Sequence, residues 1–90
     1  MVRQKVVVKN PTGLHLRPAG LLCKEAMQFK CSVHFIFHEV NANAKSVLSV
    51  LSACVKCGDE VEFVCDGEDE ETALKSIIGA IEAGLGEDIE

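Results

Sequence analysis

Apolar and polar residues alternate along three stretches of the chain, the pattern expected of β-strands that bury one face. These stretches are residues 2–8, 33–37 and 60–66. A shorter strand is expected over residues 40–44, after a turn at His38 and Glu39, and should form a hairpin with the strand before that turn. The pattern therefore predicts four strands.

Two longer stretches, residues 17–29 and 69–83, repeat apolar residues at helical spacing. Pro18 suits the first turn of the earlier helix, where a missing N–H costs nothing, so this helix should begin near His15. Acidic residues crowd the first turn of the later helix, where they complement its macrodipole, and Gly84 can end it.

A third, shorter helix should follow Ser46, whose hydroxyl can cap it, and should end near Cys54. The order is then strand, helix, strand, strand, helix, strand, helix. This order indicates an α+β fold, an open-faced β-sandwich with a four-stranded antiparallel sheet and three helices packed on one face. Residues 1–90 are expected to form one domain, because a chain of this length can bury a single core.

Composition and charge narrow the classes of function. The chain is 48% hydrophobic and 26% charged, which is typical of a globular protein. Its apolar runs fall far short of the ~20 residues that span a bilayer, and no secretion signal is visible, so we expect a cytoplasmic protein without membrane insertion. A net charge of −5 argues against nucleic-acid binding, which needs a dense basic face.

Five cysteines form an odd set without a secretion signal, which favours reduced thiols, most of them small core residues. They are Cys23, Cys31, Cys54, Cys57 and Cys65. Cys54 and Cys57 make a CxxC pair, but a structural zinc site usually needs four ligands and no second pair follows. We therefore predict no metal site, and a thiol or metal protein built on this pair is kept as an alternative.

Residues 13–19 place His15 on a tight turn at the expected start of a helix, with Arg17 two positions later. A helix start offers unpaired backbone N–H groups and positive dipole charge, so it can bind a phosphoryl group on the histidine. We expect Leu16, Arg17 and Pro18 to form this phosphate cradle, with the guanidinium adding a charge-assisted contact. Neutral imidazole is nucleophilic near neutral pH, which makes His15 the candidate phosphoryl acceptor.

The spacing alone also allows a structural role, in which His15 caps the helix and Arg17 is a solvated charge. However, residues 13–19 closely resemble the active-site signature of the HPr proteins of the bacterial sugar phosphotransferase system. The likeness extends over nearly the whole chain and includes residues 45–48 with the helix that follows them.

The resemblance implies a phosphocarrier protein and not an enzyme. By this likeness His15 accepts a phosphoryl group from enzyme I, the phosphoenolpyruvate-dependent kinase, and donates it to the enzyme IIA component of a sugar permease. Arg17 and the helix amides would stabilise the phosphohistidine enough for it to persist, but not so strongly that its phosphoryl group cannot be transferred. The resemblance implies a monomer that needs no cofactor.

Ser46 has two interpretations. As a structural residue it is a good N-cap. In HPr proteins of many Gram-positive bacteria the matching serine is phosphorylated by a dedicated kinase, HPr kinase/phosphorylase, and the surroundings of Ser46 resemble that site. The resemblance then implies slower transfer from enzyme I and a catabolite-control regulator as a further partner.

A docking face for partner proteins is expected beside His15, because the short helix after Ser46 cannot bury all its apolar residues. Its predicted members are Leu16, Gly20, Lys24, Val47, Leu48 and Leu51. Packing of this cluster under a loop is the alternative. Leu16, Gly20 and Ser49 depart from the alanine, threonine and glycine that are common in the family, which bears on the choice of partners.

Two other functions compete with the sugar phosphocarrier. HPr-like paralogues exist that keep the serine and act as regulatory binding modules, but they lack the active histidine that this chain has at position 15. A nitrogen-branch phosphocarrier would use the same fold and the same histidine chemistry.

Overall fold

The secondary structure follows the predicted order of strands and helices. The computed structural model describes residues 1–87, so the last three residues of the predicted 1–90 domain lie outside the described residues. Along the chain the elements are β1 (Val2–Val7), α1 (Leu16–Ala26), β2 (Ser32–Phe37), β3 (Val40–Asn43), α2 (Val47–Ser52), β4 (Glu60–Asp66) and α3 (Glu70–Glu82).

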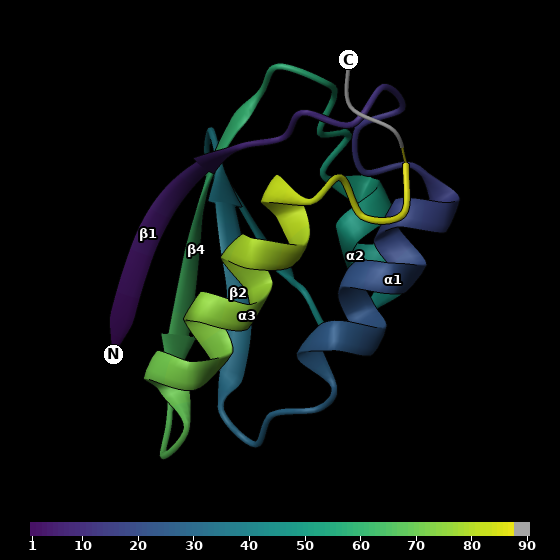
Figure 1. Cartoon of the computed structure of the whole chain (residues 1–90). Helices are drawn as coiled ribbons and strands as arrows, with labels where there is room; N and C mark the ends of the chain where they lie inside the picture. The colour runs from purple at the N-terminus through teal and green to yellow at the C-terminus, as the bar shows by residue number, and fades with distance from the viewer. Residues whose placement is uncertain (88–90) are drawn as a thin grey trace.

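The four strands form one antiparallel sheet in the order β1-β4-β2-β3, and the predicted hairpin of β2 and β3 is present. The three helices lie on one side of this sheet (Figure 1). Helix α3 packs against β1 and β4, α2 lies against β3, and α1 contacts both of the other helices. The predicted open-faced α+β sandwich is confirmed.

The core lies between the sheet and the helices. Phe35 of β2 pairs in register with Phe63 of β4, and their ring centroids are 5.3 Å apart. Alternation along each strand sends these side chains toward the helices, as period-two patterning requires. The helices bury Ala19, Leu22, Ala26, Ala73, Leu74, Ile77, Ile78 and Ile81 against them.

One helix is shorter than the apolar spacing predicts, whereas α2 ends near Cys54 as expected. Helix α1 ends at Ala26 rather than at residue 29, and Phe29 packs against the core from the loop that follows. The carbonyl of Phe29 accepts a hydrogen bond from Lys45 Nζ at 2.7 Å, so its backbone is satisfied without a helix. Helix α2 ends at Ser52, and Cys54 follows with a positive φ of 57°.

The prediction that most cysteines are core residues is wrong. Cys31 and Cys65 are buried, Cys23 is half-buried, and Cys54 and Cys57 are exposed. Burial, followed by the neighbouring Asp69 carboxylate, raises the pKa of the Cys31 thiol to about 12, and burial also raises the pKa of Cys65. The thiols of the core are therefore protonated at neutral pH.

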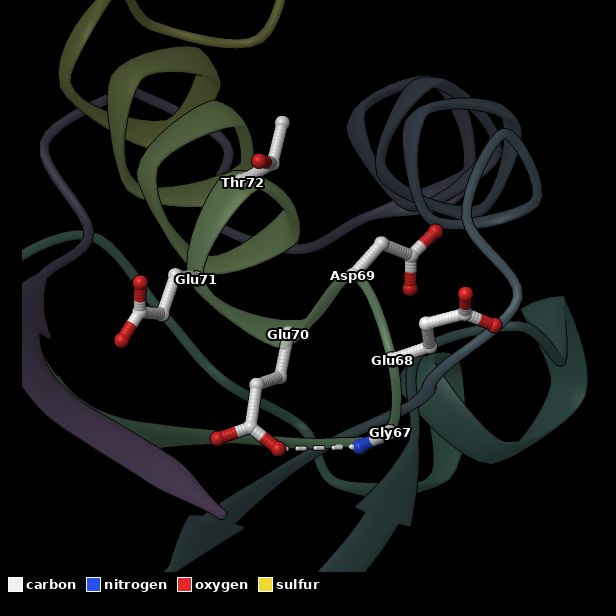
Figure 2. Close-up of a pocket in the computed structure, with 6 residues that line it drawn as sticks. All are labelled: Gly67, Glu68, Asp69, Glu70, Glu71 and Thr72. Atoms are coloured by element: carbon white, nitrogen blue, oxygen red, sulfur yellow. Dashed lines mark hydrogen bonds between the residues drawn. The ribbon is translucent and has the colours of Figure 1, made fainter.

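Asp69 ties the start of α3 to the connection between α1 and β2. Its two carboxylate oxygens accept backbone N–H groups of Lys30 and Cys31, each at 2.9 Å. Figure 2 shows Asp69 among the residues that line a hollow of about 340 Å³, where Glu70 accepts from the N–H of Gly67 at 3.1 Å. The hydrogen bonds of the Asp69 and Glu70 carboxylates thus stabilise the fold. Because acidic side chains line this hollow, it is not suited to binding an anion.

The hydrogen bonds that Asp69 accepts from Lys30 and Cys31 should make the free energy of unfolding depend on pH. The Lys30 amide, and then the Cys31 amide, hold the pKa of Asp69 below its ordinary value of 3.8. Because the folded pKa is the lower one, this contribution is present above the unfolded pKa and is lost as pH falls through the folded pKa. Asp69→Asn should therefore lower the melting temperature at about pH 7, and the difference should shrink below about pH 4.

Thermal unfolding followed by circular dichroism across this pH range measures the effect. Glu68→Gln is the matched control, because it removes the same charge from an exposed neighbour for which no hydrogen bond is found within residues 1–87. Equal melting temperatures of wild type and Asp69→Asn at neutral pH contradict the assignment.

Candidate functional site

His15 occupies the N-cap of α1, in an extended conformation with φ −78° and ψ −173°. Its side chain is exposed, and among the described residues it makes no capping hydrogen bond. The alternative in which this histidine only caps the helix is therefore not supported. The ring is accessible to a partner protein at the positive end of a helix dipole.

A tight turn before His15 aims it outward. The N–H of Gly13 donates to the carbonyl of Asn10 at 3.0 Å, and Asn10 Nδ2 donates back to the carbonyl of Gly13 at 2.6 Å. Gly13 has a φ of +65°, and a Cβ there would lie 2.5 Å from the carbonyl oxygen of Val55. The N–H of Leu14 donates to the same oxygen at 3.0 Å. Only glycine fits this approach, so the turn is held against the loop after α2.

The predicted phosphate cradle offers two backbone N–H groups. The first backbone bond of α1 runs from the N–H of Ala19 to the carbonyl of His15 at 2.8 Å, which leaves the N–H groups of Leu16 and Arg17 ahead of it. Pro18, predicted as a third cradle residue, is buried and has no N–H to donate. Its contribution is the fixed φ that suits the first turn.

The segment after α3 reaches the same turn, a contact that sequence reasoning missed. Glu87 accepts from the N–H of Thr12 at 3.2 Å, from its hydroxyl at 2.8 Å, and from Asn10 Nδ2 at 3.0 Å. Asn10 is fully buried, and its Oδ1 has no hydrogen-bond partner within residues 1–87. The bonds from Asn10 and then Thr12, with a smaller effect of Arg17, hold the pKa of Glu87 below its ordinary value.

Arg17 is exposed and lies next to this segment. A Cβ built on Gly86 would be 3.9 Å from a guanidinium nitrogen of Arg17. The first turn of α1, all of it within the described chain, contains no acidic residue. A phosphoryl group on His15 would therefore meet two amides and a guanidinium without a carboxylate in that turn.

A hollow of about 310 Å³ opens beside His15. Its lining consists of Thr12, Leu14, His15, Leu51, Cys54, Val55 and Lys56. Three of these residues, Cys54, Val55 and Lys56, come from the loop after α2, so this loop and the histidine turn share one surface. No pattern in the sequence indicated that Cys54 and His15 would line the same space.

Ser46 is the N-cap of α2, as predicted. Its hydroxyl oxygen accepts the N–H of Ser49 at 3.3 Å, and the residue is half-buried. Ser49, one of the departures from the family pattern, also uses its hydroxyl oxygen to accept the N–H of Asn43 at 2.9 Å. A serine at position 49 thus fastens α2 to the end of β3.

The residues predicted for docking lie on α1 and α2, which pack against each other (Figure 1). Leu16 is 62% exposed and Leu48 is 77% exposed. Gly20, Val47 and Leu51 are half-buried, and Lys24 is exposed. Val47 and Leu51 also touch the core cluster, so the exposed apolar contribution of α2 is mainly Leu48.

Two properties of the described residues bear on other classes of site. Among residues 1–87 no group of three or more His, Cys, Asp or Glu side chains is placed to hold a metal ion. Within the same residues, no helix has the length and apolar character to cross a membrane.

Comparison with known proteins identifies the family. The family described as the PTS HPr component phosphorylation site matches residues 2–83. The phosphocarrier protein HPr of Mycoplasma capricolum is 34% identical over 77 residues, which is 86% of each chain. The HPr-like protein Crh of Bacillus subtilis is 39% identical over 82 residues, 91% of this chain and 96% of that protein. The crystal structure of HPr-C-His from Thermoanaerobacter tengcongensis matches with a TM-score of 0.95 at 35% identity, covering 99% of this chain and 100% of that one. With this match over almost its full length, the chain belongs to the HPr family of phosphocarrier proteins.

Proposed function

We propose that the chain accepts a phosphoryl group on a ring nitrogen of His15 from phospho-enzyme I and passes it to enzyme IIA components of sugar permeases. The observation that carries this proposal is the exposed His15 ring at the N-terminus of α1, ahead of the Leu16 and Arg17 amides. No cofactor is needed, because the imidazole itself is the nucleophile.

The transfer proceeds by displacement at phosphorus. A lone pair on the imidazole attacks the phosphorus atom, the new N–P bond forms, and the bond from phosphorus to enzyme I breaks. The Leu16 and Arg17 amides and the Arg17 guanidinium share the charge of the phosphoryl oxygens. Donation to an enzyme IIA component reverses these steps, with a nucleophile of the acceptor attacking the same phosphorus atom.

The face formed by Leu16, Gly20, Lys24, Val47, Leu48 and Leu51 is proposed to dock both partners. A regulatory module without transfer activity is the second candidate, because one similar protein is an HPr-like Crh. The presence of His15 favours transfer. We also propose that the protein is a cytoplasmic monomer, whereas the similar structures include an HPr dimer and a Crh dimer.

Phosphorylation by enzyme I tests the proposed acceptor. Incubation with enzyme I and phosphoenolpyruvate should give an acid-labile, alkali-stable phosphate on the wild-type chain and none on His15→Ala. His34 and His38 remain in this variant and act as internal controls. Phosphate retained by His15→Ala contradicts the assignment, and so does a wild-type chain that takes up no phosphate.

Arg17→Ala should slow transfer without destabilising the fold. A hydrogen bond to a charged group is worth about 1.5–3 kcal/mol, so the rate should fall by about tenfold or more. Since the side chain is exposed, the free energy of unfolding should change by less than about 0.5 kcal/mol. Arg17→Lys should be intermediate, because lysine keeps the charge but not the planar fork. Arg3→Ala removes an exposed arginine on β1 and should transfer at the normal rate, which stopped-flow or quench-flow measurements can verify.

We also propose that Ser46 is a regulatory phosphorylation site for HPr kinase/phosphorylase, which would bring in a catabolite-control regulator as partner. A phosphate there adds a charge of about −2 next to Val47 and the exposed Leu48. That charge would oppose docking of enzyme I on an apolar face.

Ser46→Asp should slow phosphorylation by enzyme I, by about tenfold if the added charge costs about 1.4 kcal/mol. Ser46→Ala loses the cap without adding charge, so it should cost about 0.5–2 kcal/mol of stability and leave the transfer rate close to normal. Mass spectrometry after incubation with the kinase and ATP should locate one phosphate on Ser46. Its absence, or an equal slowing in both variants, rules out charge-based regulation at this residue.

A further inference from the structure

We propose that Cys54 and Cys57 form a redox-controlled modification site that regulates phosphoryl transfer at His15, by closing reversibly to a disulfide. The inference rests on the proposed phosphocarrier function. Its starting point is the loop between α2 and β4, which carries the two exposed thiols and contacts the histidine turn through its backbone.

Thiol chemistry should be confined to this pair. Cys54 and Cys57 are exposed, whereas Cys31 and Cys65 are buried and have raised pKa values. Cys23 is half-buried, and its Sγ donates to the carbonyl of Lys45 at 3.2 Å. Since the thiolate is the reacting form and must be reached by the oxidant, these three react more slowly. An accessible cysteine with a second one close by in the chain is the arrangement of redox-sensing thiols.

The pair is coupled to His15 by two routes. Cys54 lines the same hollow of about 310 Å³ as His15. Val55, between the two cysteines, accepts the N–H of Leu14 at 3.0 Å, and Leu14 directly precedes the histidine. The loop is fastened on its other side as well, because Cys57 Sγ donates to the carbonyl of Lys9 at 3.5 Å. A movement of residues 54–57 is therefore transmitted to the turn that aims the imidazole.

The chemistry is thiol–disulfide exchange with a low-molecular-weight disulfide. The Cys54 thiolate attacks one sulfur of the small disulfide, forms a mixed disulfide and expels one small thiol. The Cys57 thiolate then attacks Cys54 Sγ, the Cys54–Cys57 bond forms, and the second small thiol leaves. In total the two cysteines lose two electrons and two protons, and the small disulfide is reduced to two thiols.

Closing the bond removes the S–H of Cys57, and with it the hydrogen bond that Cys57 donates to the Lys9 carbonyl. A disulfide brings the two Cβ atoms to about 3.5–4.5 Å, but in the reduced chain Cys54 faces the hollow and Cys57 contacts Lys9. Tightening the segment displaces Val55, which Gly13 and Leu14 contact closely. The oxidised form should therefore misplace His15 and slow transfer.

The test uses the full chain, reduced and then incubated with oxidised glutathione under native conditions. Intact mass and peptide mapping should show a Cys54–Cys57 disulfide with Cys31 and Cys65 still reduced. Phosphorylation by enzyme I should then slow by about tenfold, since small misplacements of a reacting group have effects of this size, and dithiothreitol should restore the rate. The NMR amide signal of Leu14 should shift on oxidation, a readout that does not depend on transfer.

Oxidation of Cys57→Ser should stop at a mixed disulfide on Cys54. The control Cys23→Ser removes a thiol outside the loop and should form the Cys54–Cys57 disulfide as the wild type does. The proposal is overturned by a pair that stays reduced, by a wild-type mixed disulfide that never closes, or by an oxidised chain phosphorylated at the reduced rate. A reduced chain that enzyme I does not phosphorylate contradicts the proposed function instead. In that case the intact mass and the NMR signal of the Leu14 amide still decide whether the disulfide forms and whether it moves the histidine turn.

Discussion

The close approach of Gly13 to Val55 is the contact on which the site depends. A Cβ at Gly13 would lie 2.5 Å from the Val55 carbonyl oxygen and 2.6 Å from Lys56 Cα, so only a residue without a side chain allows it. The Leu14 N–H then bonds to the same carbonyl, and Leu14 itself is buried. His15 follows as the N-cap of α1. Its exposure is thus a consequence of backbone packing between two segments far apart in the chain.

This construction makes the proposed phosphate site largely a backbone site. The Leu16 and Arg17 amides are fixed by the helix, so they need little reorganisation when charge arrives, and donors of that kind are effective in transfer reactions. The chain as a whole carries a charge of −5, yet the described first turn of α1 contains no acidic residue. Local placement, and not net charge, makes this end of the helix suitable for an anion.

The sequence predicted the parts of the fold that depend on local pattern. Alternation located the strands, and Ser46 and Gly84 mark helix ends as expected. The end of α1 was misjudged because Phe29 keeps the helical spacing while packing from a loop. The contact of Glu87 with Thr12 could not be foreseen, since hydrogen bonds between segments so distant in sequence leave no periodic signal.

For the site, local chemistry indicated His15 and Arg17, but the sequence did not reveal their surroundings. The cysteines show why: composition favours burial of small apolar residues, and Cys31 and Cys65 obey this rule because they lie beside or within the strands of the core. Cys54 and Cys57 belong to a loop whose polar backbone must stay near the surface, so their thiols remain outside.

The packing that fixes the position of His15 also makes that position sensitive to movement of the loop after α2. The loop after α2 accepts one backbone hydrogen bond from the histidine turn, from Leu14 to Val55. Farther along the loop, the Gly58 N–H donates to the Val8 carbonyl at 2.7 Å, and the Val8 N–H, just after β1, donates to the Asp59 carbonyl at 2.9 Å. A segment held at so many points cannot move alone, because displacing the Val55 carbonyl either breaks its bond to Leu14 or carries Leu14 with it. Protein interiors are packed too densely to absorb such a shift locally. The rigidity that orients the imidazole would therefore also make the proposed transfer open to control from the surface of this loop.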